Sequence, residues 1–172
     1  IQKQANHLVN EIKNSDEVDN KMIGCAAIIL MGLAYQNQKN YVATGLNLLK
    51  KIIRTSIDNQ GFPKSRCINQ LSFYLKYFVL IREWFKESQN NIPDYLDEII
   101  YYLGSSYTFI WGNIKKDFLF NGNYISNNNE FDQYLKRLGY KFKNQNNEQA
   151  GYAILKNSKI VLAMDIGPSP NK

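Results

Sequence analysis

The regular spacing of apolar residues over the first two thirds of the chain is the feature that most constrains its fold. In residues 41–57, apolar side chains follow one another at spacings of four, three and four, which places them on one face of a helix. They are Val42, Leu46, Leu49 and Ile53. Two later segments repeat the pattern, with apolar faces formed by Ile68, Leu71, Leu75 and Phe78 and by Leu96, Ile99, Ile100 and Leu103. Together with residues 1–13 and 21–35, these segments predict about five helices packed as antiparallel hairpins.

The character of the sequence changes near residue 114. A short aromatic run, 117–121, ends in the turn sequence Asn121-Gly122-Asn123. Asn127 and Glu130 then resemble a capping box that opens a short helix, which Gly139 ends. The β-prone runs 151–155 and 159–165 predict a hairpin around Asn157-Ser158.

These elements predict a mainly α protein with a small β part. We expect a helical domain over residues 1–113 and the beginning of a β domain over residues 114–172. Since two or three strands do not make a stable sheet unaided, the sequence is interpreted as an internal piece of a longer protein. The longest apolar run, residues 22–35, is shorter than the ~20 residues of a membrane span, so no span is expected.

The net charge of +6 is distributed along the chain. Residues 1–57 carry +3, residues 58–112 carry −1, and residues 113–172 carry +4. A polyanion-binding patch needs clustered cations to focus a field, so this distribution favours scattered, solvated lysines. A nucleic-acid partner is therefore not expected.

Metal-binding and nucleotide-binding patterns are missing from the sequence. Cys25 and Cys67 lie 42 residues apart with no CxxC pair, and His7 is the one histidine of the chain, which argues against zinc. Both cysteines are interpreted as structural, with a disulfide left open, and His7 as an ordinary surface or core residue. The glycine-rich phosphate motifs and the GxSxG nucleophile motif are also missing, so no cofactor or metal is expected.

Several strings, in order, resemble the heparinase II/III-like family of bacterial polysaccharide lyases. The string Gln-Gly-Phe-Pro-Lys-Ser-Arg at residues 60–66 is similar to the family's Asp-Gly-Gly-His-x-x-Arg segment. The string Leu-Phe-Asn-Gly at residues 119–122 resembles the family's entry into its sheet domain. Gly151-Tyr152 and the string Ala-Met-Asp-Ile-Gly-Pro at residues 163–168 resemble its first sheet strands.

The resemblance implies an incomplete α/α toroid followed by an antiparallel β-sandwich. It also implies cleavage of uronate-containing polysaccharides by β-elimination, with an anionic polysaccharide as partner and a periplasmic or cell-envelope location. In that chemistry, Asn, Gln or Arg neutralises the sugar carboxylate, and Tyr or His removes the C5 proton. The isolated chain is expected to be inactive, because part of the family's catalytic set lies outside it.

Four residues are candidates for the site. Arg66, Asn121 and Asn123 are assigned to substrate binding, and Tyr124 to catalysis as the base; stacking of Tyr124 on a sugar is its other possible role. Each assignment has a structural alternative. Arg66 could cap a helix or pair with Asp58, and the three residues of the turn could serve the turn alone.

Two other functions stay open. Gln60 and Pro63 stand where the family has Asp and His, which favours a catalytically inactive relative that binds envelope polysaccharide or acts as a scaffold. A helical interaction domain is the other alternative. Most of the aromatic side chains at helical spacing between residues 95 and 111 are expected to pack, and a remainder could line a sugar groove; they are Tyr95, Tyr101, Tyr102, Tyr107 and Trp111. Tyr152 is expected to lie on the buried face of a strand.

Overall fold

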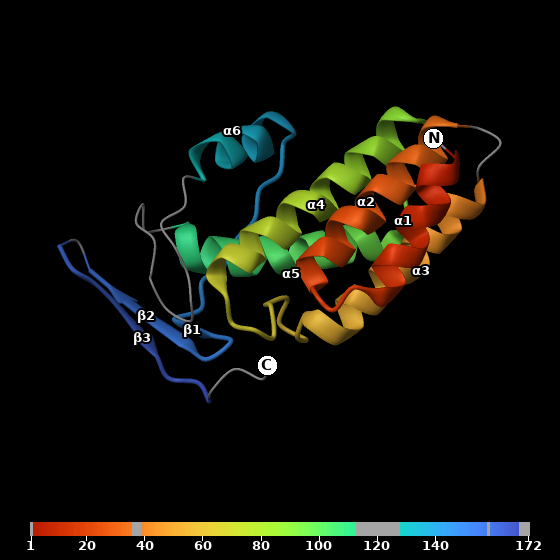
Figure 1. Ribbon diagram of the computed structural model, residues 1–172. Helices are drawn as coiled ribbons and strands as arrows, with labels where there is room; N and C mark the ends of the chain where they lie inside the picture. The colour runs from red at the N-terminus through yellow and green to blue at the C-terminus, as the bar shows by residue number, and fades with distance from the viewer. Residues whose placement is uncertain (1, 36–38, 113–127, 158, 169–172) are drawn as a thin grey trace. The chain divides into compact units, whose positions relative to one another are not determined.

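The structure is a computed structural model that describes residues 2–35, 39–112, 128–157 and 159–168. Within these residues the chain is mainly helical and has a small antiparallel sheet, as the sequence predicts (Figure 1). The helices are α1 (Gln2–Asn14), α2 (Val18–Ala34), α3 (Lys39–Ser56), α4 (Ile68–Glu87), α5 (Asp94–Trp111) and α6 (Asn129–Arg137). The strands are β1 (Glu148–Gln149), β2 (Tyr152–Lys156) and β3 (Val161–Asp165).

The chain divides into two compact units. Unit 1 comprises Ile1–Ser56 and Tyr77–Asp97, and unit 2 comprises Ile57–Lys76 and Glu98–Lys172. Helices α4 and α5 each contribute residues to both units. The domain boundary expected at residue 114 falls outside the described residues and stays a prediction.

In unit 1, α2 packs against both α1 and α3, and each contact is close at a glycine. A Cβ added at Gly24 would lie 2.4 Å from Ile12 Cδ1, and one added at Gly45 would lie 2.5 Å from Ile29 Cγ1. The missing side chains thus let the neighbouring isoleucines fill the space between helices. Of the described helices, none is both long and apolar enough to span a membrane.

The apolar face predicted for α3 is only partly correct. Leu49 is fully buried, but Val42, Leu46 and Ile53 are half-buried. The buried positions of this helix are Tyr41, Gly45, Leu49 and Ile52. The helix is therefore turned toward Gly45, because the close approach of Ile29 there decides which face meets α2.

The faces predicted for α4 and α5 are confirmed, because all eight of their apolar positions are buried. The expectation that the aromatic residues pack is correct for Tyr107, which is 5% exposed. Tyr101 and Tyr102 are 60% and 41% exposed and form the remainder that does not pack. These two lie on the side of α5 away from its apolar face, where aromatic spacing alone cannot predict burial.

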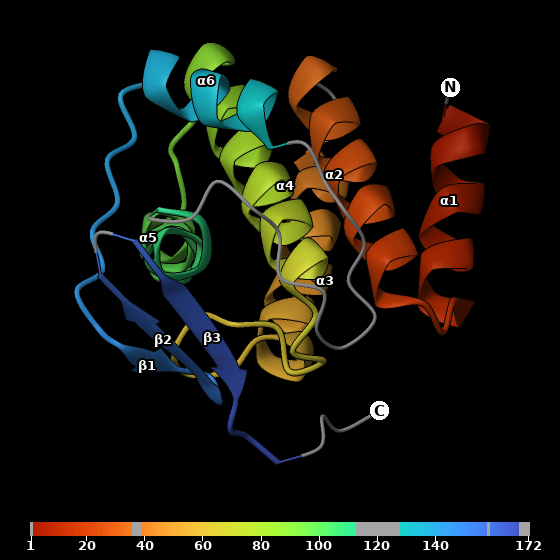
Figure 2. The ribbon, with the colours of Figure 1, turned by 90° about the vertical axis from the view of Figure 1, so that its left-hand side faces the viewer.

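The sheet of unit 2 has the strand order β1-β2-β3 and is antiparallel throughout (Figure 2). The predicted hairpin is confirmed, with Tyr152 opposite Asp165 and Leu155 opposite Leu162. Tyr152 is buried, as expected, at 2% exposure. Its partner position in the register, Asp165, lies on the same face of the sheet.

Helix α6 begins later than predicted and ends where predicted. Its N-cap is Asn128, whose side chain makes no capping hydrogen bond. The expected capping box joins Glu130 to Asn127, which lies outside the described residues, so it stays a prediction. At the other end, Gly139 has φ +82° and donates its N–H to Lys136 O at 3.1 Å. Tyr140 N–H donates to Leu135 O at 3.0 Å, which completes a Schellman motif.

Candidate functional site

The loop before α4 is a tight, hydrogen-bonded structure. Asp58 Oδ1 accepts hydrogen bonds from Gln60 N–H at 2.9 Å and Phe62 N–H at 2.8 Å, as expected of an Asx turn. Gly61 has φ +76°, and a Cβ there would lie 2.5 Å from the backbone of Tyr102, so this position needs glycine. The loop then turns back to Pro63, whose carbonyl accepts the Arg66 N–H at 2.8 Å.

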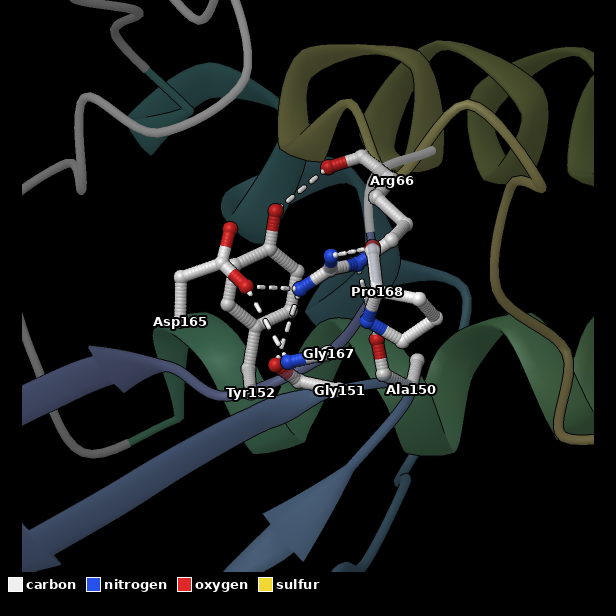
Figure 3. A network of polar contacts seen from close by, with 7 residues as sticks. All are labelled: Arg66, Ala150, Gly151, Tyr152, Asp165, Gly167 and Pro168. Carbon is white, nitrogen blue, oxygen red and sulfur yellow. Dashed lines mark hydrogen bonds and ion pairs between the residues drawn. The ribbon is translucent and has the colours of Figure 1, made fainter. Parts of the chain in front are cut away.

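Arg66 is the centre of a polar cluster that joins this loop to the sheet (Figure 3). Its Nε donates to Ala150 O at 3.3 Å, its Nη1 to Pro168 O at 2.5 Å, and its Nη2 to Gly151 O at 2.8 Å. Nη2 also forms an ion pair with Asp165 Oδ1. We call this set the Arg66 cluster: Arg66, Ala150, Gly151, Tyr152, Asp165, Gly167 and Pro168.

Two glycines leave space for the guanidinium of Arg66, and a tyrosine ring lies against it. A Cβ at Gly167 would lie 2.8 Å from Arg66 Cζ, and one at Gly151 would lie 3.0 Å from Arg66 Nη2. The guanidinium carbon stands 4.8 Å from the centroid of the Tyr152 ring, a cation–π distance, and the Tyr152 hydroxyl donates to Arg66 O at 2.6 Å. Arg66 itself has φ +57°, a conformation that a non-glycine residue adopts at a cost.

A second buried network lies beside the same loop. Gln149 Nε2 donates to Ser106 Oγ at 2.7 Å and to Gln60 O at 3.1 Å, while Ser106 Oγ donates to Gln60 O at 3.0 Å. Gln60 Oε1 accepts the Ala150 N–H at 2.8 Å. Gln60 therefore connects the loop, α5 and the turn between β1 and β2.

The structure places Arg66 among protein acceptors. Its residue exposure is 8%, and the substrate-binding role assigned to it stays a prediction. The alternative of a pair with Asp58 is wrong, because Arg66 forms its ion pair with Asp165. Asp58 instead accepts backbone N–H groups of its own loop. To contact this guanidinium, an incoming carboxylate would have to compete with Asp165.

The other candidate residues, Asn121, Asn123 and Tyr124, lie outside the described residues, so the structure does not test their placement. His7 is an exposed residue of α1, and its Nδ1 lies 4.0 Å from Glu11 Oε1. Among the described residues, no group of three His, Cys, Asp or Glu side chains is placed to hold a metal ion.

Sequence reasoning identified Arg66 but missed its partners. Asp165 and Gly151 lie 99 and 85 residues further along the chain. Their signal was present in the strings at residues 151–152 and 163–168, which were associated with the strands and not with Arg66. Separations of this size leave no periodicity from which a contact can be predicted.

Unit 1 contains two titratable groups with raised pKa values. Burial raises the pKa of the Cys25 thiol from its usual 9.0 to about 12, and Cys25 is fully buried. Burial, followed by the charge of Cys25, raises the pKa of Tyr95 to about 12. Neither Cys25 nor Cys67 forms a disulfide. A protonated, inaccessible thiol is inert, which agrees with a structural role for Cys25.

No protein-family model, curated protein or solved structure matches this chain.

Proposed function

We propose that this chain is part of a heparinase II/III-like polysaccharide lyase, which cleaves uronate-containing anionic glycans by β-elimination. The observation that carries the proposal is the Arg66 cluster. Four strings support the resemblance. Arg66 belongs to the string at residues 60–66, and it hydrogen-bonds or pairs with residues of the strings at 151–152 and 163–168, at 85 to 102 residues' separation. The string at residues 119–122 lies outside the described residues. Because residues of three strings contact one another in one buried cluster, these strings are not independent matches. We take them as joint support for the resemblance.

In the proposed reaction, the C5 proton of the uronate passes to a base and the bond from the sugar ring to the leaving oxygen breaks. An unsaturated sugar results, and the leaving oxygen takes up a proton. Tyr124 is the proposed base, and Asn121 and Asn123 are proposed to neutralise the sugar carboxylate. The Arg66 cluster then acts as a structural support for the sheet in unit 2.

The test uses the whole gene product and a panel of uronate polysaccharides, with ultraviolet absorbance followed for the unsaturated product. A rise in absorbance with one polymer is expected. Tyr124→Phe should then lower turnover by about a hundredfold or more, because it removes the group that takes the proton. The matched control is Tyr101→Phe, an exposed tyrosine of α5, which should leave turnover unchanged. Equal turnover in the two variants would exclude Tyr124 as the base.

One observation favours a second function, that of a catalytically inactive relative that binds carbohydrate. Gln60 and Pro63, at the family's Asp and His positions, both serve the local fold: Gln60 binds the Ala150 N–H, and Pro63 pairs with Ile57 in a β-bridge. The same assay distinguishes the two. Binding of a polysaccharide with no rise in absorbance supports the inactive relative, and a rise excludes it.

A further inference from the structure

Positive charge is concentrated in one short stretch of unit 2. Residues 133–147 contain four cations and no Asp or Glu, so they account for the whole +4 of residues 113–172. We call these the basic segment: Lys136, Arg137, Lys141 and Lys143. All four side chains are exposed. Counting over long windows conceals this concentration, because the remaining charges of residues 113–172 cancel.

The chain after α6 is held so that its lysines point to solvent. Phe142 packs against Gly104 of α5, where a Cβ would lie 2.3 Å from its ring. Asn144 Nδ2 donates to Ser105 O and Ser105 Oγ, each at 3.1 Å, and Ser105 Oγ donates to Lys143 O at 3.3 Å. Positions 142 and 144 thus face α5, and the alternate positions 141 and 143 are exposed.

The two cations at the end of α6 are also exposed and lie close to these lysines in the chain. The Schellman motif at Gly139 turns the chain directly from Lys136 and Arg137 to the two lysines. Arg137 Cζ lies 5.4 Å from the Tyr134 ring centroid, and within the described residues no carboxylate pairs with any of the four cations. The helix dipole explains the positions of Lys136 and Arg137, but not those of Lys141 and Lys143.

Neutral groups beside the cations fit a sugar chain. The rings of Tyr140 and Phe142 are stacked at 5.7 Å, and both residues are half-buried. Exposed amide side chains follow at Gln145, Asn146 and Asn147, and amides both donate to and accept from hydroxyl groups. This combination of cations, aromatic rings and amides suits a polymer that carries both acidic groups and hydroxyls.

We propose that the basic segment is a docking surface for an anionic polysaccharide; the choice of a glycan rests on the function proposed above. The four cations bind its carboxylates or sulfates through long-range attraction and counterion release. A nucleic acid is the competing polyanion, and the test below distinguishes it from the glycan.

The test measures binding of the chain to a fluorescent oligogalacturonate over a range of salt concentrations. Lys141→Gln together with Lys143→Gln should weaken binding by about tenfold and make the salt dependence shallower. The matched control, Lys13→Gln together with Lys51→Gln, removes the same charge from exposed positions of unit 1 and should weaken binding less than about twofold. Since all four lysines are exposed, folding is expected to be unchanged.

Four results would overturn the proposal. Equal losses in the two double variants would mean that net charge, and not the basic segment, binds the polymer. Tighter binding of single-stranded DNA of equal charge would assign the segment to nucleic acid. Cleavage of a glycan by the whole gene product, with unchanged binding in the Lys141/Lys143 variant, would exclude the basic segment as the docking surface and still support the lyase function. If no uronate polymer is bound or cleaved, the lyase and the glycan both fall.

Discussion

The contacts described above stabilise each unit in a different way, through apolar packing within unit 1 and through buried polar contacts within unit 2. In unit 1, α2 meets its neighbours through isoleucines that fill the space above Gly24 and Gly45. In unit 2, a buried guanidinium and the Gln60–Ser106–Gln149 network join the loop before α4 to α5 and the sheet. Apolar packing tolerates small adjustments, whereas a buried polar group that loses its partner carries the full cost of desolvation.

This difference makes the two units unequally sensitive to substitution. A buried ion pair contributes little net stability when intact, yet breaking it leaves a charge without compensation. Substitution of Arg66 in unit 2 should therefore be more damaging than a substitution at the glycine contacts of unit 1. The predictions test this order.

The largest effect is expected for Arg66→Ala. It removes the ion pair with Asp165 and the hydrogen bonds to three carbonyl groups, and should lower the free energy of unfolding by about 3 kcal/mol. This is the low end for a buried pair, because the Asp165 side chain is 29% exposed. Chemical denaturation measures it.

Arg66→Gly is the matched control for the backbone. Glycine relieves the cost of φ +57°, so this variant should be about 1 kcal/mol more stable than Arg66→Ala. A loss below about 1 kcal/mol in the alanine variant would show that the Arg66 cluster does not stabilise unit 2.

An intermediate effect is expected for Gly45→Ala in unit 1. The new Cβ would lie 2.5 Å from Ile29 Cγ1 and 3.3 Å from the Cys25 carbonyl oxygen, so α2 and α3 must move apart or Ile29 must change rotamer. The cost of overpacking, less the gain in helix propensity, should be about 1–2 kcal/mol. Adding Ile29→Val should recover part of the loss, and no recovery would place the strain elsewhere.

The smallest effect, and of opposite sign, is expected for Tyr95→Phe. The Tyr95 hydroxyl oxygen is buried and, within the described residues, has no hydrogen-bond partner, so removing it should stabilise the chain by up to about 1 kcal/mol at neutral pH. Denaturation of both proteins at pH 7 measures this difference. A clear loss of stability would reveal a partner for this hydroxyl.

The same variant gives a pH test. The pKa of Tyr95 is raised from 10.0 to about 12, so the unfolded chain releases this proton first and stability falls as pH rises between these values. Tyr95→Phe should weaken that fall. Below pH 9 the two proteins should show nearly parallel profiles, because Tyr95 stays largely protonated there in both the folded and the unfolded chain, and Cys25 is present in both proteins.

Net charge over long windows and the position of the basic segment give different pictures of the same lysines. The net charges of +3, −1 and +4 are counted over three long windows of sequence, and at that scale they favour scattered lysines. The structure shows that Lys141 and Lys143 point outward together because Phe142 and Asn144 are held by α5. The exposure of these two lysines depends on the contacts of Phe142 and Asn144 with α5, and a count of charges carries no information about those contacts.

By itself, the sequence determined the elements that arise from local interactions. Apolar spacing located five helices and the buried faces of α4 and α5, and Gly139 marked the end of α6. These are short-range effects, since side chains three or four residues apart share a helical face and glycine alone adopts positive φ without cost. The hairpin of β2 and β3 followed from β propensity around a turn.

Only the tertiary structure decided the partners of Arg66, the rotation of α3 toward Gly45 and the exposure of Tyr101. Each depends on groups far apart in the chain: Arg66 meets Asp165 across 99 residues, and the face of α3 is set by Ile29 of another helix. Such contacts form where burial and hydrogen bonding are satisfied together, and local propensity does not select them.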